Sequence, residues 1–406
     1  MSTTTQHPTG VTAIRPFHAD FAGEAVDELR RRLSATRWPT RELVGDASQG
    51  VQLATMQTLV RYWAGEYDFG RLEARLNAVA QFKTRIDGLD VHFIHVKSAH
   101  ADALPLIITH GWPGSIVEML DVVGPLTDPT AHGGGGDAFD VVVPSLPGYG
   151  FSEVPTSRGW DAGRVARAWA ELMRRLGYSR YVAQGGDVGA AVTDTMAIQA
   201  PDGLAGIHLN FLRRQPPEIT ATVFGGAPVP EGLTEAERAA LAPLVRQFKK
   251  GYIAEQGQTP QTIGYSLTDS PAGLASWILD HDADAYAKAA RAFLDGSASG
   301  GLTRDAILDN ITLYWLTATG TSAARIYWEN QHAAAAAAAQ APPEVSLPVA
   351  FTVFPGEIFR APRHWAERVY PNLVYFNEVD RGGHFAAWEE PALFADEMRA
   401  AFRSLR

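Results

Sequence analysis

Short apolar runs alternate with helix-like stretches along much of the chain. The runs at 104–109, 141–144, 181–183, 349–354 and 373–376 are rich in β-branched or other apolar residues and are short enough for buried strands. Segments with helical character follow most of these runs. This alternation predicts an α/β fold whose mostly parallel sheet is flanked by helices.

Two regions depart from this alternation. In residues 1–87 a polar tail leads into amphipathic stretches in which Phe21, Leu29 and Leu33 mark one helical face, so we expect this region to wrap the core. Residues 210–340 lose the strand pattern and become helical, which predicts a lid. The expected parts are an N-terminal helical extension (1–87), a first core part (88–209), the lid (210–340) and a second core part (341–406).

Composition narrows the classes of partner. The chain has 406 residues, of which 46% are apolar, and this is enough for a large core. A formal net charge of −10 argues against a surface for nucleic acid or for an anionic membrane. The absence of cysteine excludes disulfides, zinc thiolates and thiolate nucleophiles. We expect a cytoplasmic protein with no nucleic acid partner and no membrane anchor, and we leave open whether it forms a homodimer.

The run Gly185-Gly186-Asp187-Val188-Gly189 has the spacing of the nucleophile elbow of serine hydrolases, with aspartate at the central position. The type of residue at this central position determines which covalent intermediate can form and whether water can cleave it. A serine that attacked an sp³ carbon would leave an inert ether, whereas an aspartate leaves an ester that water can cleave. The alternative is a structural aspartate, because Asp and Gly both favour turns.

Partners for such a nucleophile follow in the chain order that this scaffold uses, which is nucleophile, acid, histidine. Glu357 comes just after the apolar run 349–354, and His384 lies in a glycine-containing loop after the run 373–376. We expect His384 to take a proton from water and Glu357 to orient its ring. Glu378 or Asp380 could supply the acid instead, and His384 could be an ordinary loop residue.

An oxyanion hole is expected from two backbone amides. Val188 follows the nucleophile and supplies the first amide. Trp112 supplies the second, because it lies in the sequence His110-Gly-Trp-Pro-Gly at the end of the run 104–109. The competing interpretation of that sequence is a tight turn fixed by proline.

Four segments together resemble a known family, namely His110–Ser115, Ser145–Ser152, Gly185–Gly189 and Arg381–Pro391. They are similar to the α/β-hydrolase-fold epoxide hydrolases, in the microsomal-type branch that includes fungal and bacterial members. The segments 15–39 and 62–96 look like the N-terminal region peculiar to that branch, so nearly the whole chain is covered. The eukaryotic microsomal members carry an N-terminal membrane anchor, which we do not expect in this protein.

The resemblance implies roles for individual residues. Asp187 matches the family's nucleophile, His384 its base and Glu357 its charge-relay acid. The family also uses two lid tyrosines, for which Tyr252 and Tyr327 are the candidates, whereas Tyr265, Tyr286 and Tyr314 are rivals. A phenol suits the step because opening an epoxide generates an alkoxide, a stronger base than a phenolate.

The predicted function is conversion of a small apolar epoxide and water into a vicinal diol, with neither a metal ion nor an organic cofactor. A haloalkane dehalogenase would share the scaffold and the aspartate, but such enzymes typically place Trp after the nucleophile, where this chain has Val188. The second alternative is a non-catalytic protein that holds an apolar ligand in the lid cavity. The presence of Asp187, Glu357 and His384 together argues against a pure binder.

Overall fold

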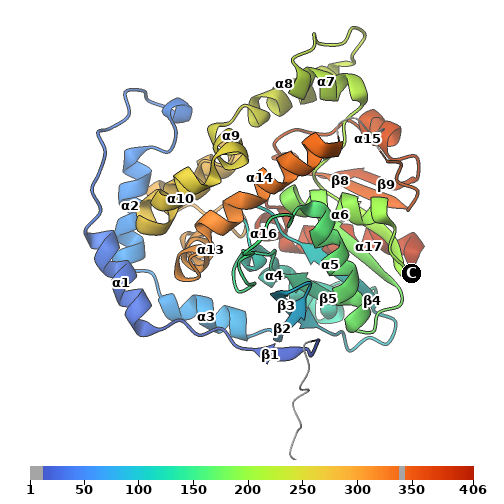
Figure 1. The fold of residues 1–406 in the computed structure, drawn as a ribbon, viewed down its shortest axis with the longest axis horizontal. Coiled ribbons are helices and arrows are strands. Elements are labelled where there is room, and N and C mark those ends of the chain that lie inside the picture. The colour runs from blue at the N-terminus through green and yellow to red at the C-terminus, as the bar shows by residue number, and fades with distance from the viewer. Residues whose placement is uncertain (1–11, 338–342) are drawn as a thin grey trace, which may run out of the picture.

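A nine-stranded sheet crosses the computed structural model, which describes residues 12–337 and 343–406 (Figure 1). The strand order is β1-β2-β3-β5-β4-β6-β7-β8-β9. All pairs from β5 to β9 are parallel, and the three pairs that join β1, β2, β3 and β5 are antiparallel. The strands are β1 (Arg15–Phe17), β2 (Gln81–Ile86), β3 (Leu89–Val96), β4 (Leu104–Thr109), β5 (Phe139–Pro144), β6 (Tyr181–Gly185), β7 (Leu204–Leu209), β8 (Val349–Val353) and β9 (Leu373–Glu378).

Helices cover both faces of this sheet because its central strands are apolar on both sides. Along β5, Val142 packs in one buried cluster with Trp169, whereas Val141 and Val143 pack in a second cluster with Met398, as the period-2 geometry of a strand requires. The mostly parallel α/β-hydrolase architecture expected from the sequence is thus confirmed. The covering helices are α4 (Leu120–Thr127), α5 (Ala162–Arg175), α6 (Asp187–Gln199), α15 (Arg363–Val369), α16 (Ala386–Glu389) and α17 (Pro391–Phe402).

The N-terminal region is not purely helical, since it also supplies β1 and β2 to the edge of the sheet. A tight turn at Asp87-Gly88 joins β2 to β3, and both residues have positive φ, 49° and 83°, which the Asp-Gly pair tolerates. The helices of this region contact those of the 217–337 segment, with α1 and α2 against α11, α2 also against α12 and α3 against α13. They are α1 (Gly23–Ser34), α2 (Leu53–Gly65) and α3 (Phe69–Asn77).

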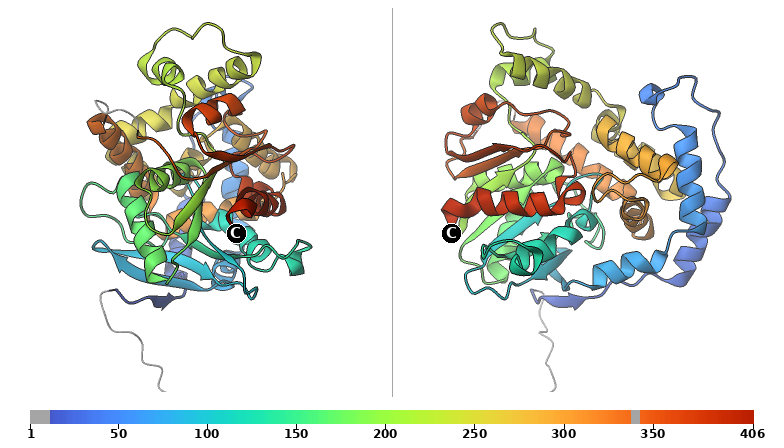
Figure 2. Two further views of the ribbon diagram at one scale, coloured as in Figure 1. Left: turned by 90° about the vertical axis from the view of Figure 1, so that its right-hand side faces the viewer. Right: turned by 180° about the vertical axis from the view of Figure 1, so that it is seen from behind.

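Between β7 and β8 the chain forms only helices and loops, apart from one isolated bridge between Ser299 and Leu302, within the described residues of this segment. Figures 1 and 2 show these helices packed over the carboxyl ends of the parallel strands, with α14 running alongside α9 and α10. The expected boundary at 340/341 lies outside the described residues. The helices are α7 (Pro217–Gly225), α8 (Glu235–Phe248), α9 (Gly251–Gln258), α10 (Pro260–Asp269), α11 (Pro271–Leu279), α12 (Ala283–Asp295), α13 (Arg304–Leu316) and α14 (Gly320–Ala337).

Four short 3₁₀ helices complete the secondary structure of the described ranges, at Ala47–Gln49, Ile116–Met119, Thr130–His132 and Arg403–Leu405. A bilayer crossing needs roughly 20 mostly apolar residues in a helix. Among the helices of residues 12–337 and 343–406, none combines that length with that apolar character.

Candidate active site

Asp187 lies at the first position of α6, directly after the end of β6, with φ at 49°. Glycines make this sharp turn sterically feasible. A Cβ on Gly185 would lie 2.1 Å from the Gly189 carbonyl oxygen, and a Cβ on Gly189 would lie 1.9 Å from the Thr109 carbonyl oxygen. The strand–turn–helix context expected of a nucleophile elbow is therefore present, with the carboxylate at its tip.

The two oxygens of the Asp187 carboxylate have different surroundings. Oδ1 accepts a 2.8 Å hydrogen bond from the backbone N–H of Trp112, which is one of the two amides predicted for an oxyanion hole. Gly111 allows this approach, because a Cβ there would come within 2.4 Å of the Asp187 side chain. Val188, the other predicted donor, is the next residue of α6. Oδ2 lies 3.4 Å from Nε2 of His384, so it is the oxygen that faces the histidine.

The loops after β8 and β9 bring Glu357 and His384 together. The two strands are parallel neighbours, and a bridge between Gly356 and Gly383 joins the loops themselves. Oε1 of Glu357 lies 2.5 Å from Nδ1 of His384, and both side chains are only 2% exposed. The alternative acids Glu378 and Asp380 are exposed, so neither orients this ring.

Charge coupling sets the ionisation of the site. Burial by itself would raise the pKa of the Asp187 carboxyl, but His281 and His384 beside it outweigh burial and hold that pKa well below its ordinary value. Burial would likewise lower the pKa of His384, but Glu357 and Asp187 outweigh it and hold the pKa well above its ordinary value. These opposite shifts favour a carboxylate beside a protonated imidazole in the resting site.

Tyr252 on α9 and Tyr327 on α14 line the same cavity as Asp187. Both rings contact Trp112, with ring centroids 4.8 Å and 5.8 Å away. Burial and the negative charge of Asp187 raise the pKa of each phenol well above its ordinary value, so both remain protonated donors. Gln247 donates a 2.8 Å hydrogen bond to the Tyr252 oxygen.

The rival tyrosines have other positions. Tyr265 is 70% exposed on the outer surface. The Tyr286 hydroxyl accepts a hydrogen bond from the backbone N–H of Gln52, and the Tyr314 hydroxyl donates one to the carbonyl of Gly114. None of these three lines the cavity that contains Asp187.

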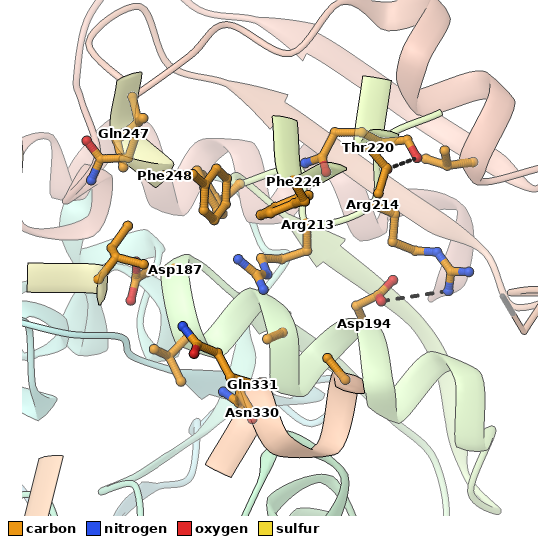
Figure 3. Close-up of a pocket in the computed structure, with 18 of the residues that line it drawn as sticks. Asp187, Asp194, Arg213, Arg214, Thr220, Phe224, Gln247, Phe248, Asn330 and Gln331 are labelled. Atoms are coloured by element: carbon orange, nitrogen blue, oxygen red, sulfur yellow. Dashed lines mark hydrogen bonds and ion pairs between the residues drawn. The ribbon is translucent and has the colours of Figure 1, made fainter. Parts of the chain in front are cut away.

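The cavity has a volume of about 1050 Å³. Figure 3 shows its upper wall, where Phe224 and Phe248 lie side by side, and the Arg213 side chain extending into the space between that wall and Asn330 and Gln331. Aromatic rings and aliphatic side chains form much of the rest of the lining. The site therefore offers a large and mainly apolar space in contact with the carboxylate.

Two further groups at the site were not found from the sequence. His281, in the α11–α12 loop, places Nε2 3.8 Å from Oδ2 of Asp187, while its Nδ1 lies 2.9 Å from Oδ2 of Asp282. Glu118 is buried, and its burial raises the pKa of its carboxyl to about 8. Neither residue belongs to a motif, so only the folded chain reveals their proximity to the nucleophile.

Comparison with known proteins identifies the family. The chain matches the family model "Epoxide hydrolase N terminus" over residues 14–119 and the model "alpha/beta hydrolase fold" over residues 105–246. It is 35% identical over 399 residues to "Epoxide hydrolase 1" of Sus scrofa, an alignment that covers 95% of this chain and 88% of the relative. The chain belongs to the epoxide hydrolase family.

Other epoxide hydrolases agree over the same span. A protein of Stigmatella aurantiaca, provisionally named an epoxide hydrolase, is 51% identical and is aligned over 97% of this chain and 86% of its own length. The crystal structure of juvenile hormone epoxide hydrolase from Bombyx mori superposes with a TM-score of 0.84 at 33% identity, covering 97% and 96% of the two chains. For the Aspergillus niger epoxide hydrolase the TM-score is 0.81 at 30% identity, with 97% of each chain covered. This epoxide hydrolase is thus an enzyme of the class predicted from its motifs, and the dehalogenase and binding-protein alternatives are not favoured.

Proposed function

We propose that this epoxide hydrolase opens its substrate by attack of Asp187 Oδ2 on a ring carbon, and that the resulting alkyl ester is hydrolysed by water activated by His384 and Glu357. The observation that carries the proposal is that the two carboxylate oxygens of Asp187 have different contacts. Trp112 binds Oδ1, so Oδ2 is left as the oxygen available for attack. The low pKa of Asp187 keeps this oxygen anionic.

In the first half-reaction, Tyr252 and Tyr327 donate to the epoxide oxygen. As the Oδ2–carbon bond forms, the carbon–oxygen bond of the ring breaks and its electron pair stays on that oxygen, which takes a proton from a phenol. Both phenols are protonated because burial and Asp187 disfavour their phenolate forms. The phenolate left behind then takes a proton from His384.

Formation of the ester changes the charge next to His384. The raised pKa of His384 depends partly on the negative charge of Asp187, and that charge disappears when the carboxylate becomes an ester. His384 therefore gives up its proton more readily at this stage and becomes a general base. The first step thus prepares the base for the second.

The hydrolytic water has a space of its own in this proposal. A second cavity of about 20 Å³ lies beside Asp187 and His384 and is also lined by Glu118, Gln184 and Asn210. That volume accommodates roughly one water molecule, and the lining offers several polar partners. A water there would approach the carboxyl carbon of Asp187 while Trp112 and Val188 stabilise the tetrahedral oxyanion.

For the remaining parts of the chain we propose a lid and a substrate class. The 210–340 segment acts as the lid, because Tyr252, Tyr327, Phe224 and Phe248 reach the cavity from its helices. Residues 1–87 act as an extension that wraps the core, and the core itself consists of residues 88–209 and 341–406. The apolar lining suits a small apolar epoxide.

A single turnover in heavy-oxygen water tests the ester mechanism. With enzyme in excess over styrene oxide, the first diol should contain no label from solvent, because its new oxygen comes from Asp187. When styrene oxide is instead in excess over enzyme, diol formed in later turnovers should be labelled, since water replaces the donated oxygen. Label in the first diol would mean that water attacked the ring directly and would overturn the proposal.

A further inference from the structure

A second histidine–acid pair faces the nucleophile from the lid. Nδ1 of His281 lies 2.9 Å from the Asp282 carboxylate, and its Nε2 lies 3.8 Å from Asp187 Oδ2, the same oxygen that His384 approaches at 3.4 Å. The His281 side chain is 1% exposed. Its Nε2 atom has no hydrogen-bond partner among residues 12–337 and 343–406, although it is buried and aimed at a reacting oxygen.

The surroundings of His281 hold it in this position. Gln247 donates to its backbone carbonyl at 3.2 Å, and the same amide group bonds the Tyr252 hydroxyl. The ring lies against Tyr252 and His384, at centroid distances of 5.5 Å and 4.5 Å. Asp282 is fixed as well, because it also caps α12 by accepting from the Ala285 N–H. A buried side chain fixed at both ends suits proton transfer better than a mobile one.

The order of groups through the site is acid, histidine, acid, histidine, acid, running from Glu357 through His384, Asp187 and His281 to Asp282. Each ring lies between two carboxylates, and both rings have Asp187 as a shared neighbour. Once Asp187 is an ester, the two rings have lost the carboxylate they share, and positive charges on both of these adjacent rings would repel each other.

The two rings differ in their access to water. His384 lines the 20 Å³ cavity assigned above to the hydrolytic water, whereas His281 is not part of that lining. His384 is therefore the ring that becomes the base. That leaves His281 as the ring placed to donate a proton to the substrate oxygen.

We propose that His281, oriented by Asp282, is a second catalytic histidine that protonates the departing diol oxygen during ester hydrolysis. Water adds to the carboxyl carbon of Asp187 and gives a proton to His384. When the bond between that carbon and Oδ2 breaks, the electron pair stays on Oδ2, which takes the Nε2 proton of His281 and leaves as the diol hydroxyl. The new Asp187 carboxylic acid then returns a proton to His281, which restores the resting state.

The test separates the two half-reactions in His281→Phe and His281→Gln. Phe keeps a ring but has no proton to give, and Gln keeps an N–H donor but cannot transfer a proton. With enzyme in excess over styrene oxide, rapid quenching and mass analysis of the peptide that contains Asp187 give the rates of ester formation and loss. We expect ester loss to slow by about 100-fold in both variants and ester formation by less than about fivefold.

A dependence on the leaving group identifies proton donation. Without an acid, ester loss should become more sensitive to the basicity of the departing oxygen, so para-nitrostyrene oxide should recover part of the lost rate in both variants. Asp282→Asn retains an oxygen to cap α12. This variant should slow ester loss by about tenfold, with the same dependence on the leaving group. Asp280→Asn is the matched control, because that neighbouring acid pairs with Lys250 rather than with the site.

Three outcomes would overturn this assignment. The first is a rate of ester loss in His281→Phe equal to that of the wild type. The second is a wild-type rate of ester loss in His281→Gln. The third is a slower ester loss in all variants that does not depend on the basicity of the leaving group. Since the assignment rests on the ester mechanism, the wild-type enzyme is measured in parallel. Absence of any ester there would contradict the ester mechanism, whereas ester that is lost equally fast in wild-type and His281 variants would contradict only the role of His281.

Discussion

Two histidine–acid pairs meet at one carboxylate, and they come from different regions of the molecule. Glu357 and His384 lie in loops at the ends of neighbouring parallel strands of the core, whereas His281 and Asp282 lie in a loop between two helices of the 210–340 segment. The first pair is joined by a 2.5 Å contact and the second by a 2.9 Å contact. The core pair approaches Asp187 Oδ2 more closely, at 3.4 Å against 3.8 Å.

The comparison shows how a sheet and a helical segment can divide one reaction. In the proposed mechanism the core supplies the nucleophile, the oxyanion amide of Trp112 and the base, all of which depend on strand ends. The helical segment would add the two phenols and, with His281, a second proton donor. In that mechanism the groups that protonate the substrate oxygens come from the helical segment, and the groups that activate the hydrolytic water come from the core.

Removal of the shared carboxylate should have the largest effect. Asp187→Ala leaves both pairs without the group they face, so neither half-reaction can proceed through an ester. We expect diol formation to fall by a factor on the order of 10⁵. Steady-state assays with styrene oxide measure this, and activity within tenfold of wild type would contradict the assignment of the nucleophile.

Damage to the core pair alone should separate the two steps. In His384→Gln, Asp187 still attacks, but water lacks its base, so hydrolysis should fall by roughly 10³- to 10⁴-fold and the ester should accumulate. The mass of the elbow peptide after incubation with substrate reports this directly. A variant that turns over normally, or one that forms no ester, would contradict the proposed role.

Removal of either phenol hydroxyl should slow ester formation rather than ester loss. Tyr252→Phe and Tyr327→Phe remove a donor to the epoxide oxygen, and each should slow ester formation by about 10- to 100-fold while leaving ester loss nearly unchanged. Rapid-quench measurements of both rates test this. Tyr265→Phe is the matched control, because that hydroxyl is on the exposed surface.

The pH dependence of ester formation and of ester loss should distinguish the nucleophile Asp187 from the base His384. The depressed pKa of Asp187 means that its carboxylate stays ionised as the pH falls, whereas His384 in the ester state must lose a proton to act. Ester formation should therefore persist at about pH 5, while ester loss slows by about tenfold relative to about pH 8. If both rates fell together, the proposed change in His384 on esterification would be wrong.

Two acids that could have been the partner of His384 should differ widely in their effect. Glu357→Gln should lower ester hydrolysis by about 10²- to 10⁴-fold, because the His384 ring loses the carboxylate that orients it. The competing acid Asp380 should give the smallest effect of all. Asp380→Asn, whose carboxylate pairs with exposed Arg381, should change the rate by less than about twofold. Equal losses in the two variants would remove the preference for Glu357.

The core and its site were largely predictable because their signals are local. Gly185, Asp187 and Gly189 specify a turn that only glycines permit, and strand ends in a parallel sheet necessarily meet at one edge. Glu357 and His384 could therefore be assigned from their positions just after two apolar runs. Within residues 1–87, β1 was not predicted, since this strand is only three residues long and depends on its pairing with β2.

By itself, the sequence determined the fold class and predicted the nucleophile and the order of its partners, because glycine spacing, strand length and chain order are short-range properties. Only the tertiary structure decided that His281 lies beside Asp187, that Asp282 pairs with His281 and that Glu118 lines the small cavity next to Asp187. Their positions depend on how helices pack over the sheet, and packing of apolar faces leaves no periodic signature at the polar residues it brings together. The same reason explains why Tyr252 and Tyr327, rather than their rivals, face the cavity.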